Sequence, residues 1–140
     1  MPTAGDYSRI ADPAINPGDG PYFEAAGEGR LMLRCCRACG EHHHFPRAIC
    51  PFCWSQELDW VEASGRGTIY TFSVTRRGER APYCIAYVQL EEGPLMMTNI
   101  VAADLDEVRI GMRVAAIFPK SEGGLGVPMF SPVESDSPAE

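Results

Sequence analysis

The chain divides near Gly65 into two stretches with different hydrophobic patterns. After this glycine, apolar and polar residues alternate with a period of two, most clearly in residues 68–74, and this alternation predicts half-buried β-strands. We expect the other strands at residues 83–90, 95–101, 113–118 and 127–130. A polar loop at 76–82, a turn at 91–94 and a short helical link at 105–108 separate them.

Five short strands with a link between the third and the fourth are typical of the OB-fold, a five-stranded, partly open Greek-key barrel. The pattern therefore predicts a mainly β protein with an OB-fold at residues 65–133. Residues 134–140 are small and polar, and they predict a disordered tail.

The stretch before Gly65 is less regular. Residues 1–19 are rich in proline, glycine and aspartate and have no apolar period, which predicts an extended arm. The run from Pro21 to Gly27 predicts a short helix, because proline suits the first helical turn and glycine suits the C-terminal cap. Residues 31–33 then lead into a small cysteine-rich module, and residues 54–61 form its return strand. We place this module and its helix at residues 20–64.

Two cysteine pairs, Cys36-Arg-Ala-Cys39 and Cys50-Pro-Phe-Cys53, give this module its chemistry. Each pair sets two thiolates on one tight turn, and four thiolates can close a tetrahedron around Zn²⁺. A glycine directly after the first pair suits a turn whose exit needs a positive φ. We therefore predict a rubredoxin-like Cys₄ zinc ribbon with one structural Zn²⁺, since a closed site leaves no position open for catalysis.

Disulfides and a redox dithiol are the alternatives for these cysteines. The first residues show neither a basic segment nor an apolar one, so we expect a cytoplasmic protein, and disulfides are rare in the cytoplasm. A redox dithiol needs one such pair on a βαβ unit, and the pattern predicts none.

Other sulfur and imidazole groups lie close to the pairs. Cys35 precedes Cys36 directly, but the two-residue spacing to Cys39 favours Cys36 as the ligand. We expect Cys35 and Cys84 to be packed thiols. The three histidines 42–44 are expected at the tip of the ribbon hairpin and not on the metal.

Charge and composition exclude several classes of protein. The net charge is −7, whereas a nucleic-acid-binding domain is usually basic. Residues 30–80 nevertheless carry eight arginines against five acids, so an anion would be attracted to the middle of the chain. No apolar run approaches the length of about 18 residues that a membrane helix needs. We find no pattern of catalytic residues and no phosphate-binding loop, so catalysis by this chain alone is not expected.

These residues resemble the DUF35 family. Residues 22–59, with Glu28-Gly29-Arg30-Leu31, both cysteine pairs and Phe45-Pro46-Arg47 between them, are similar to its zinc-ribbon half. Residues 65–132, with Gly67-Thr68-Ile69-Tyr70-Thr71-Phe72 and the run 109–114, are similar to its OB-fold half. The chain departs from the family at Trp54, where a small residue usually follows the second pair.

The resemblance implies an accessory subunit that associates with a thiolase-fold enzyme and helps to bind its acyl-CoA substrate. On this basis we assign two candidate sites from the sequence. Arg76, Arg77 and Arg80 lie in the loop after the first barrel strand and are candidates for holding CoA phosphates. Tyr22 and Phe23 on the short helix are candidates for the partner-binding surface, unless they fold back on their own barrel.

Two other functions stay open at this point. A nucleic-acid-binding protein is the first, because zinc ribbons and OB-folds both serve that purpose. It is disfavoured by the acidic charge and by Met96, Met97 and Thr98 where stacking aromatics would be needed. A scaffold that binds a partner enzyme but no ligand is the second.

Overall fold

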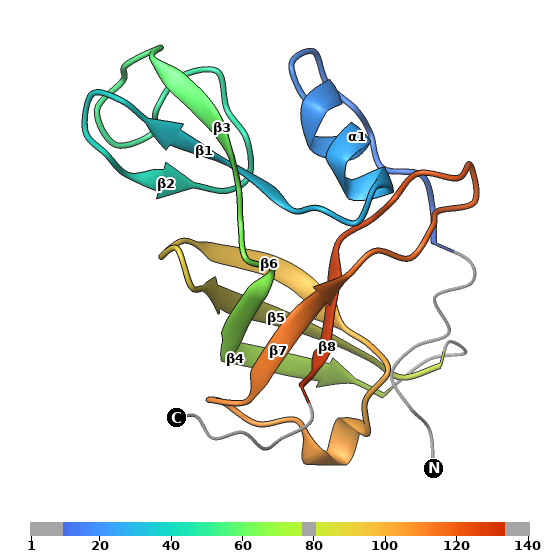
Figure 1. The fold of residues 1–140 in the computed structure, drawn as a ribbon. Coiled ribbons are helices and arrows are strands. Elements are labelled where there is room, and N and C mark those ends of the chain that lie inside the picture. The colour runs from blue at the N-terminus through green and yellow to red at the C-terminus, as the bar shows by residue number, and fades with distance from the viewer. Residues whose placement is uncertain (1–9, 77–80, 134–140) are drawn as a thin grey trace.

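A three-stranded sheet and a five-stranded barrel lie one above the other in the computed structural model, which describes residues 10–76 and 81–133 (Figure 1). The upper part contains α1 (Gly20–Gly27), β1 (Met32–Cys36), β2 (His42–His43) and β3 (Leu58–Glu62). The barrel contains β4 (Arg66–Thr75), β5 (Tyr83–Leu90), β6 (Leu95–Ile100), β7 (Arg113–Ile117) and β8 (Met129–Pro132), with the 3-10 helix η2 (Leu105–Glu107) after β6. The predicted mainly β fold, a cysteine ribbon followed by an OB-fold barrel, is confirmed.

The barrel closes in the order β4-β5-β6-β8-β7, with β7 pairing back to β4. The contact between β6 and β8 is parallel, and the other pairs are antiparallel. Gly67 allows β4 to approach β5 closely, because a Cβ at this position would lie 2.5 Å from Cγ1 of Val88 and 2.7 Å from the oxygen of Gln89.

Two strands begin two or more residues later than predicted. The return strand of the ribbon begins at Leu58 and not at 54, since residues 54–57 form an irregular exit in which the amide of Cys50 donates to the oxygen of Ser55 at 2.8 Å. The last barrel strand begins at Met129 and not at 127. Val127 is still part of the preceding loop, where its amide donates to the oxygen of Pro119 at 2.9 Å.

The helix α1 joins the ribbon to the barrel by burying its aromatic side chains. Tyr22 is 3 % exposed and Phe23 is 8 % exposed, and both belong to the same core cluster as the barrel residues. The Tyr22 hydroxyl and Nε2 of His44 share a hydrogen bond of 2.8 Å, and the Tyr22 ring centroid lies 5.0 Å from that of Phe45. Both rings thus fold back on the chain's own core, which is the alternative that the sequence left open, and neither is exposed as a partner anchor.

Residues 10–19 form no helix or strand, but they are held against the barrel loop 121–126. The Asp12 carboxylate accepts hydrogen bonds from the Ser121 hydroxyl at 2.6 Å and the Gly123 amide at 2.7 Å, which lower the pKa of Asp12. The same loop touches α1, because a Cβ on Gly126 would lie 2.5 Å from the oxygen of Ala26. The predicted tail at 134–140 lies outside the described residues.

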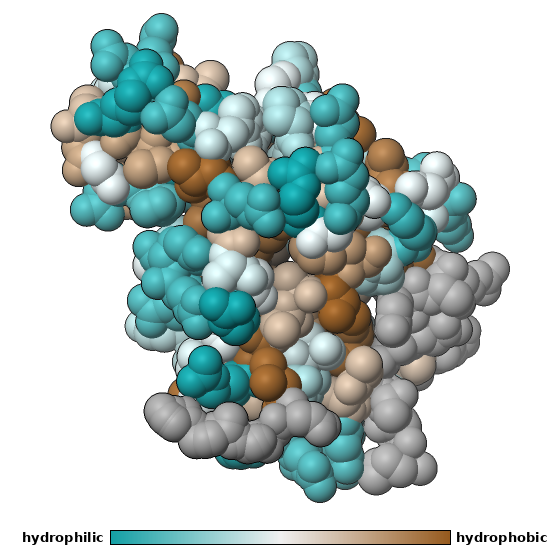
Figure 2. Space-filling model, viewed as in Figure 1, coloured by the Kyte–Doolittle hydropathy of each residue, from teal (hydrophilic) through white to brown (hydrophobic). Residues whose placement is uncertain are grey.

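Hydrophobic residues show between the ribbon and the barrel and on the front of the barrel in Figure 2. Among residues 10–76 and 81–133, no helix has the length and apolar character needed to cross a membrane.

Candidate metal centre

The first cysteine pair sits on a tight turn at the end of β1. The amide of Cys39 points at Sγ of Cys36, 3.4 Å away, and the amide of Gly40 donates to the oxygen of Cys36 at 2.8 Å. Gly40 has φ +80°, a conformation that costs glycine little. The predicted role of this glycine at the exit of the turn is therefore confirmed.

The second cysteine pair repeats this turn with a different exit residue. The amide of Phe52 points at Sγ of Cys50, 3.4 Å away, and the amide of Trp54 donates to the oxygen of Cys50 at 2.9 Å. Trp54 has φ 70°, close to the value at Gly40, although a tryptophan is rarely found in this region. The departure at Trp54 thus leaves the turn geometry unchanged.

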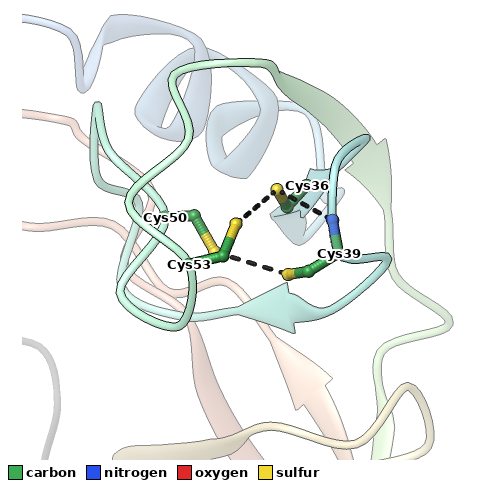
Figure 3. A group of neighbouring side chains, drawn as sticks. All are labelled: Cys36, Cys39, Cys50 and Cys53. Carbon is green, nitrogen blue, oxygen red and sulfur yellow. Dashed lines mark hydrogen bonds between the residues drawn. The ribbon is translucent and has the colours of Figure 1, made fainter.

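The four sulfurs point into one space between the two turns (Figure 3). All four lie within 4.8 Å of one another, with Cys36 and Cys53 3.5 Å apart and Cys39 and Cys50 3.7 Å apart. Bonds of about 2.3 Å from four thiolates to a tetrahedral Zn²⁺ require sulfurs separated by about 3.8 Å. The cluster is therefore a metal-binding site whose size fits a zinc ion.

The titration of these thiols also favours a bound cation. Backbone hydrogen bonds, the one from Cys39 first, lower the pKa of Cys36 to about 6. At Cys39 the backbone bond from Glu41 acts to lower the pKa, but burial and the neighbouring sulfurs raise it to about 12. The negative charge on one thiolate thus disfavours ionisation of the next thiol. A divalent cation removes this repulsion by stabilising all four charges.

The remaining sulfur and imidazole groups stay outside the cluster. Within residues 10–76 and 81–133, the group of possible ligands at this site contains only Cys36, Cys39, Cys50 and Cys53. Cys84 is fully buried in the barrel core, as predicted, and burial raises its pKa. The histidines form β2 and its exit, with His43 paired to Arg34 of β1.

The arginine loop is only partly described. Nη2 of Arg76 lies 2.7 Å from Oδ1 of Asp106 in a solvent-exposed ion pair. Arg77 and Arg80 lie outside the described residues.

The sequence prediction missed an uncharged face on the barrel. Tyr70, Ile85, Tyr87, Leu95 and Met97 are all exposed on β4, β5 and β6, and Tyr87 lies opposite Met97 in the register. Apart from Arg66 at the start of β4, the outward positions of the same strands carry no charge, a signal that the alternating pattern already contained.

Both halves of the chain match described protein families. Residues 23–59 match the "ChsH2, rubredoxin-like zinc ribbon domain", and residues 60–118 match the "ChsH2, C-terminal OB-fold domain".

Similar proteins include subunits of enzymes that act on CoA thioesters. A probable enoyl-CoA hydratase alpha subunit of Thermomonospora curvata is 37 % identical over 86 % of this chain, which spans only 39 % of that protein's length. A DUF35 domain-containing scaffold protein of Methanocaldococcus jannaschii is 37 % identical over 71 % of this chain and 79 % of its own. The benzoylsuccinyl-CoA thiolase subunit BbsA of Thauera aromatica is 35 % identical over 58 % of this chain and 60 % of its own.

A solved structure supports the same relationship. One chain of the structure titled "Ltp2-ChsH2(DUF35) aldolase" superposes with a TM-score of 0.77 and 37 % identity. The match covers 86 % of this chain and 98 % of the other.

Proposed function

Because this chain belongs to the DUF35 family, we propose that it is a non-catalytic accessory subunit of a thiolase-fold enzyme and helps that enzyme to bind an acyl-CoA substrate. The observation that carries this proposal is the match to nearly the whole length of a DUF35 chain from an aldolase. The similarity to a benzoylsuccinyl-CoA thiolase subunit supports both the type of enzyme and the type of substrate.

In this proposal the metal is one structural Zn²⁺ held by Cys36, Cys39, Cys50 and Cys53 in the cytoplasm, where thiols stay reduced. The proposal is supported by the four sulfurs, which lie within 4.8 Å of one another. Zinc would hold the two turns together, and it would leave no position for a substrate.

The loop after β4 is our candidate for the contact with CoA. Arg76 pairs with Asp106, but the two side chains are 47 % and 67 % exposed, and exposed ion pairs contribute little free energy. A phosphate can therefore replace the carboxylate, because guanidinium groups bind phosphate oxygens through two parallel hydrogen bonds. Arg77 and Arg80 would add two such groups.

Affinity capture from cells of the source organism tests the association. The tagged chain should retain a thiolase-fold enzyme that mass spectrometry identifies, and the two purified proteins should elute together from a sizing column. Recovery of nucleic acid and no such enzyme would contradict the proposal.

Calorimetry with the purified complex tests the role in acyl-CoA binding. The complex should bind acyl-CoA more tightly than the enzyme alone, and replacing Arg76, Arg77 and Arg80 together by alanine should remove this gain. The matched control is Arg66→Ala, which removes an exposed guanidinium paired with Glu91 at the opposite end of β4. If the enzyme bound acyl-CoA equally well with and without this chain, the chain would be a scaffold that binds no ligand.

A further inference from the structure

The two metal-binding turns show what the fold requires after each cysteine pair. Gly40 and Trp54 both have a positive φ, and each donates its amide to the oxygen of the first cysteine of its pair. Glycine satisfies the first turn without strain, whereas a side chain in this conformation is unfavourable. The conformation of the turn therefore does not require a tryptophan at position 54.

The Trp54 side chain also buries little of its surface within the folded chain. It is 80 % exposed, and it is accompanied by Phe52, which is 60 % exposed, and Ile49, which is 41 % exposed. We call Ile49, Phe52 and Trp54 the knuckle patch. Residues 48–54 contain no lysine, arginine or histidine, so no basic side chain in this segment attracts phosphate groups. Backbone strain and exposed apolar surface at the same place indicate a binding function.

We propose that the knuckle patch is a docking surface and that Trp54 inserts into an apolar pocket of the thiolase-fold partner. This inference rests on the proposed function and adds to it the residues that recognise the enzyme. Tryptophan is enriched among the residues that dominate binding energy at interfaces. The metal-bound turn holds the ring in place before binding, which reduces the entropy lost when the complex forms.

The match to a DUF35 chain from an aldolase structure favours an enzyme over a second copy of this chain as the partner. A stable interface buries about 800 Å² on each partner, and even a fully buried aromatic side chain supplies only about 150–250 Å². Two aromatic residues and one isoleucine therefore supply only part of an interface, and the rest must come from other surfaces of this chain. A projecting indole fits a concave pocket on a larger protein that gains further contacts with the rest of this chain.

Trp54→Gly separates this role from a structural one. The substitution removes the ring and relieves the strained backbone, so the free protein should keep its zinc and unfold at a higher denaturant concentration. Its affinity for the purified enzyme, measured by calorimetry, should fall more than about 10-fold. Trp54→Phe keeps an aromatic ring and should give an intermediate affinity.

The matched control is Ile110→Ala, which truncates a side chain that is 66 % exposed. Ile110 belongs to the link between η2 and β7. The start of β7, to which this link leads, lies at the end of the barrel away from the ribbon (Figure 1). This variant should bind the enzyme as the wild type does.

Three results would overturn the inference in distinguishable ways. Wild-type affinity in Trp54→Gly would show that the knuckle patch is not the docking surface, while the accessory function would stand. A free wild-type chain that is dimeric in light scattering, together with a monomeric Trp54→Gly, would assign the patch to a second copy. Failure of the wild-type chain itself to bind any thiolase-fold enzyme would contradict the proposed function as well.

Discussion

The ribbon and the barrel of this protein are stabilised in different ways. Among residues 10–76 and 81–133, the buried cluster around the metal site consists of only Cys36, Cys50 and Leu58. The other cluster in this part of the chain runs from the base of the ribbon through the barrel and contains nineteen buried residues, among them Phe130 and Leu33, which are fully buried. A region as small as the ribbon tip cannot bury enough apolar surface, so a metal must supply what the core lacks.

The change from stabilisation by a metal to stabilisation by hydrophobic packing does not occur at the boundary between the ribbon and the barrel. Leu31 and Leu33 lie before or on β1, and Tyr22 lies on α1, yet all three belong to the barrel cluster. The base of the ribbon is thus held by hydrophobic packing, and only its tip depends on the cysteines. The following predictions separate the two contributions, beginning with the largest.

Removal of the metal should have the largest effect and should act on one region only. Cys39→Ala should lose the bound zinc and unfold the ribbon tip, because zinc binding contributes about 10 kcal/mol or more in small zinc modules. Metal analysis should find one zinc in the wild type, and the amide resonances of β4–β8 should persist in NMR spectra of the variant.

Cys35→Ala is the control for this experiment, since Cys35 precedes the ligand Cys36 but is not part of the cluster. This variant should retain the metal. Loss of zinc from Cys35→Ala alone would show that the ligand set is wrong.

A cavity in the barrel core should destabilise the barrel and leave the metal site intact. Phe130 is fully buried, and Phe130→Ala should lower the free energy of unfolding by about 3–5 kcal/mol. In the absence of denaturant the variant should still hold its zinc. Urea titration followed by circular dichroism measures the loss, and a change below about 0.5 kcal/mol, as expected for a surface site, would contradict this account of the core.

Acid should weaken the contact between the helix and the ribbon. Burial, with a smaller effect of His43, lowers the pKa of His44 from 6.5 to about 4. Between these values the unfolded chain binds a proton that the folded chain does not, so stability is lost as the pH falls below 6.5. The loss should be about 1.4 kcal/mol for each pH unit within this window.

His44→Gln should flatten this dependence, because the glutamine amide does not titrate. Urea titrations of both proteins between pH 7.5 and pH 5.5, about one unit into the window, measure the difference. The metal content must be constant over this range. An equally steep loss in both proteins would assign the acid sensitivity to other groups.

The smallest effect should come from exchanging the exits of the two metal-binding turns. Trp54→Gly should raise the free energy of unfolding by about 1 kcal/mol, and Gly40→Ala should lower it by about the same amount. Both variants should retain zinc. Destabilisation by Trp54→Gly would mean that the ring makes a contact that stabilises the folded chain.

Local patterns were sufficient for much of the fold. The cysteine spacing identified all four members of the cluster and excluded Cys35, since two residues between ligands set the size of the turn. The alternation after Gly65 located every barrel strand, although the start of β8 was displaced by two residues. The pairing of Val127 with Pro119, which causes this shift, is a contact between residues on opposite sides of a loop.

By itself, the sequence determined which cysteines come together in the cluster and which segments form the barrel, because cysteine spacing and alternation are properties of neighbouring residues. Only the tertiary structure decided what covers each aromatic side chain. Tyr22 and Trp54 each follow a short turn-forming run in the chain, yet Tyr22 is 3 % exposed and Trp54 is 80 % exposed. The difference arises because His44 and the barrel core approach α1 from distant parts of the chain, whereas the exit of the second turn points into solvent.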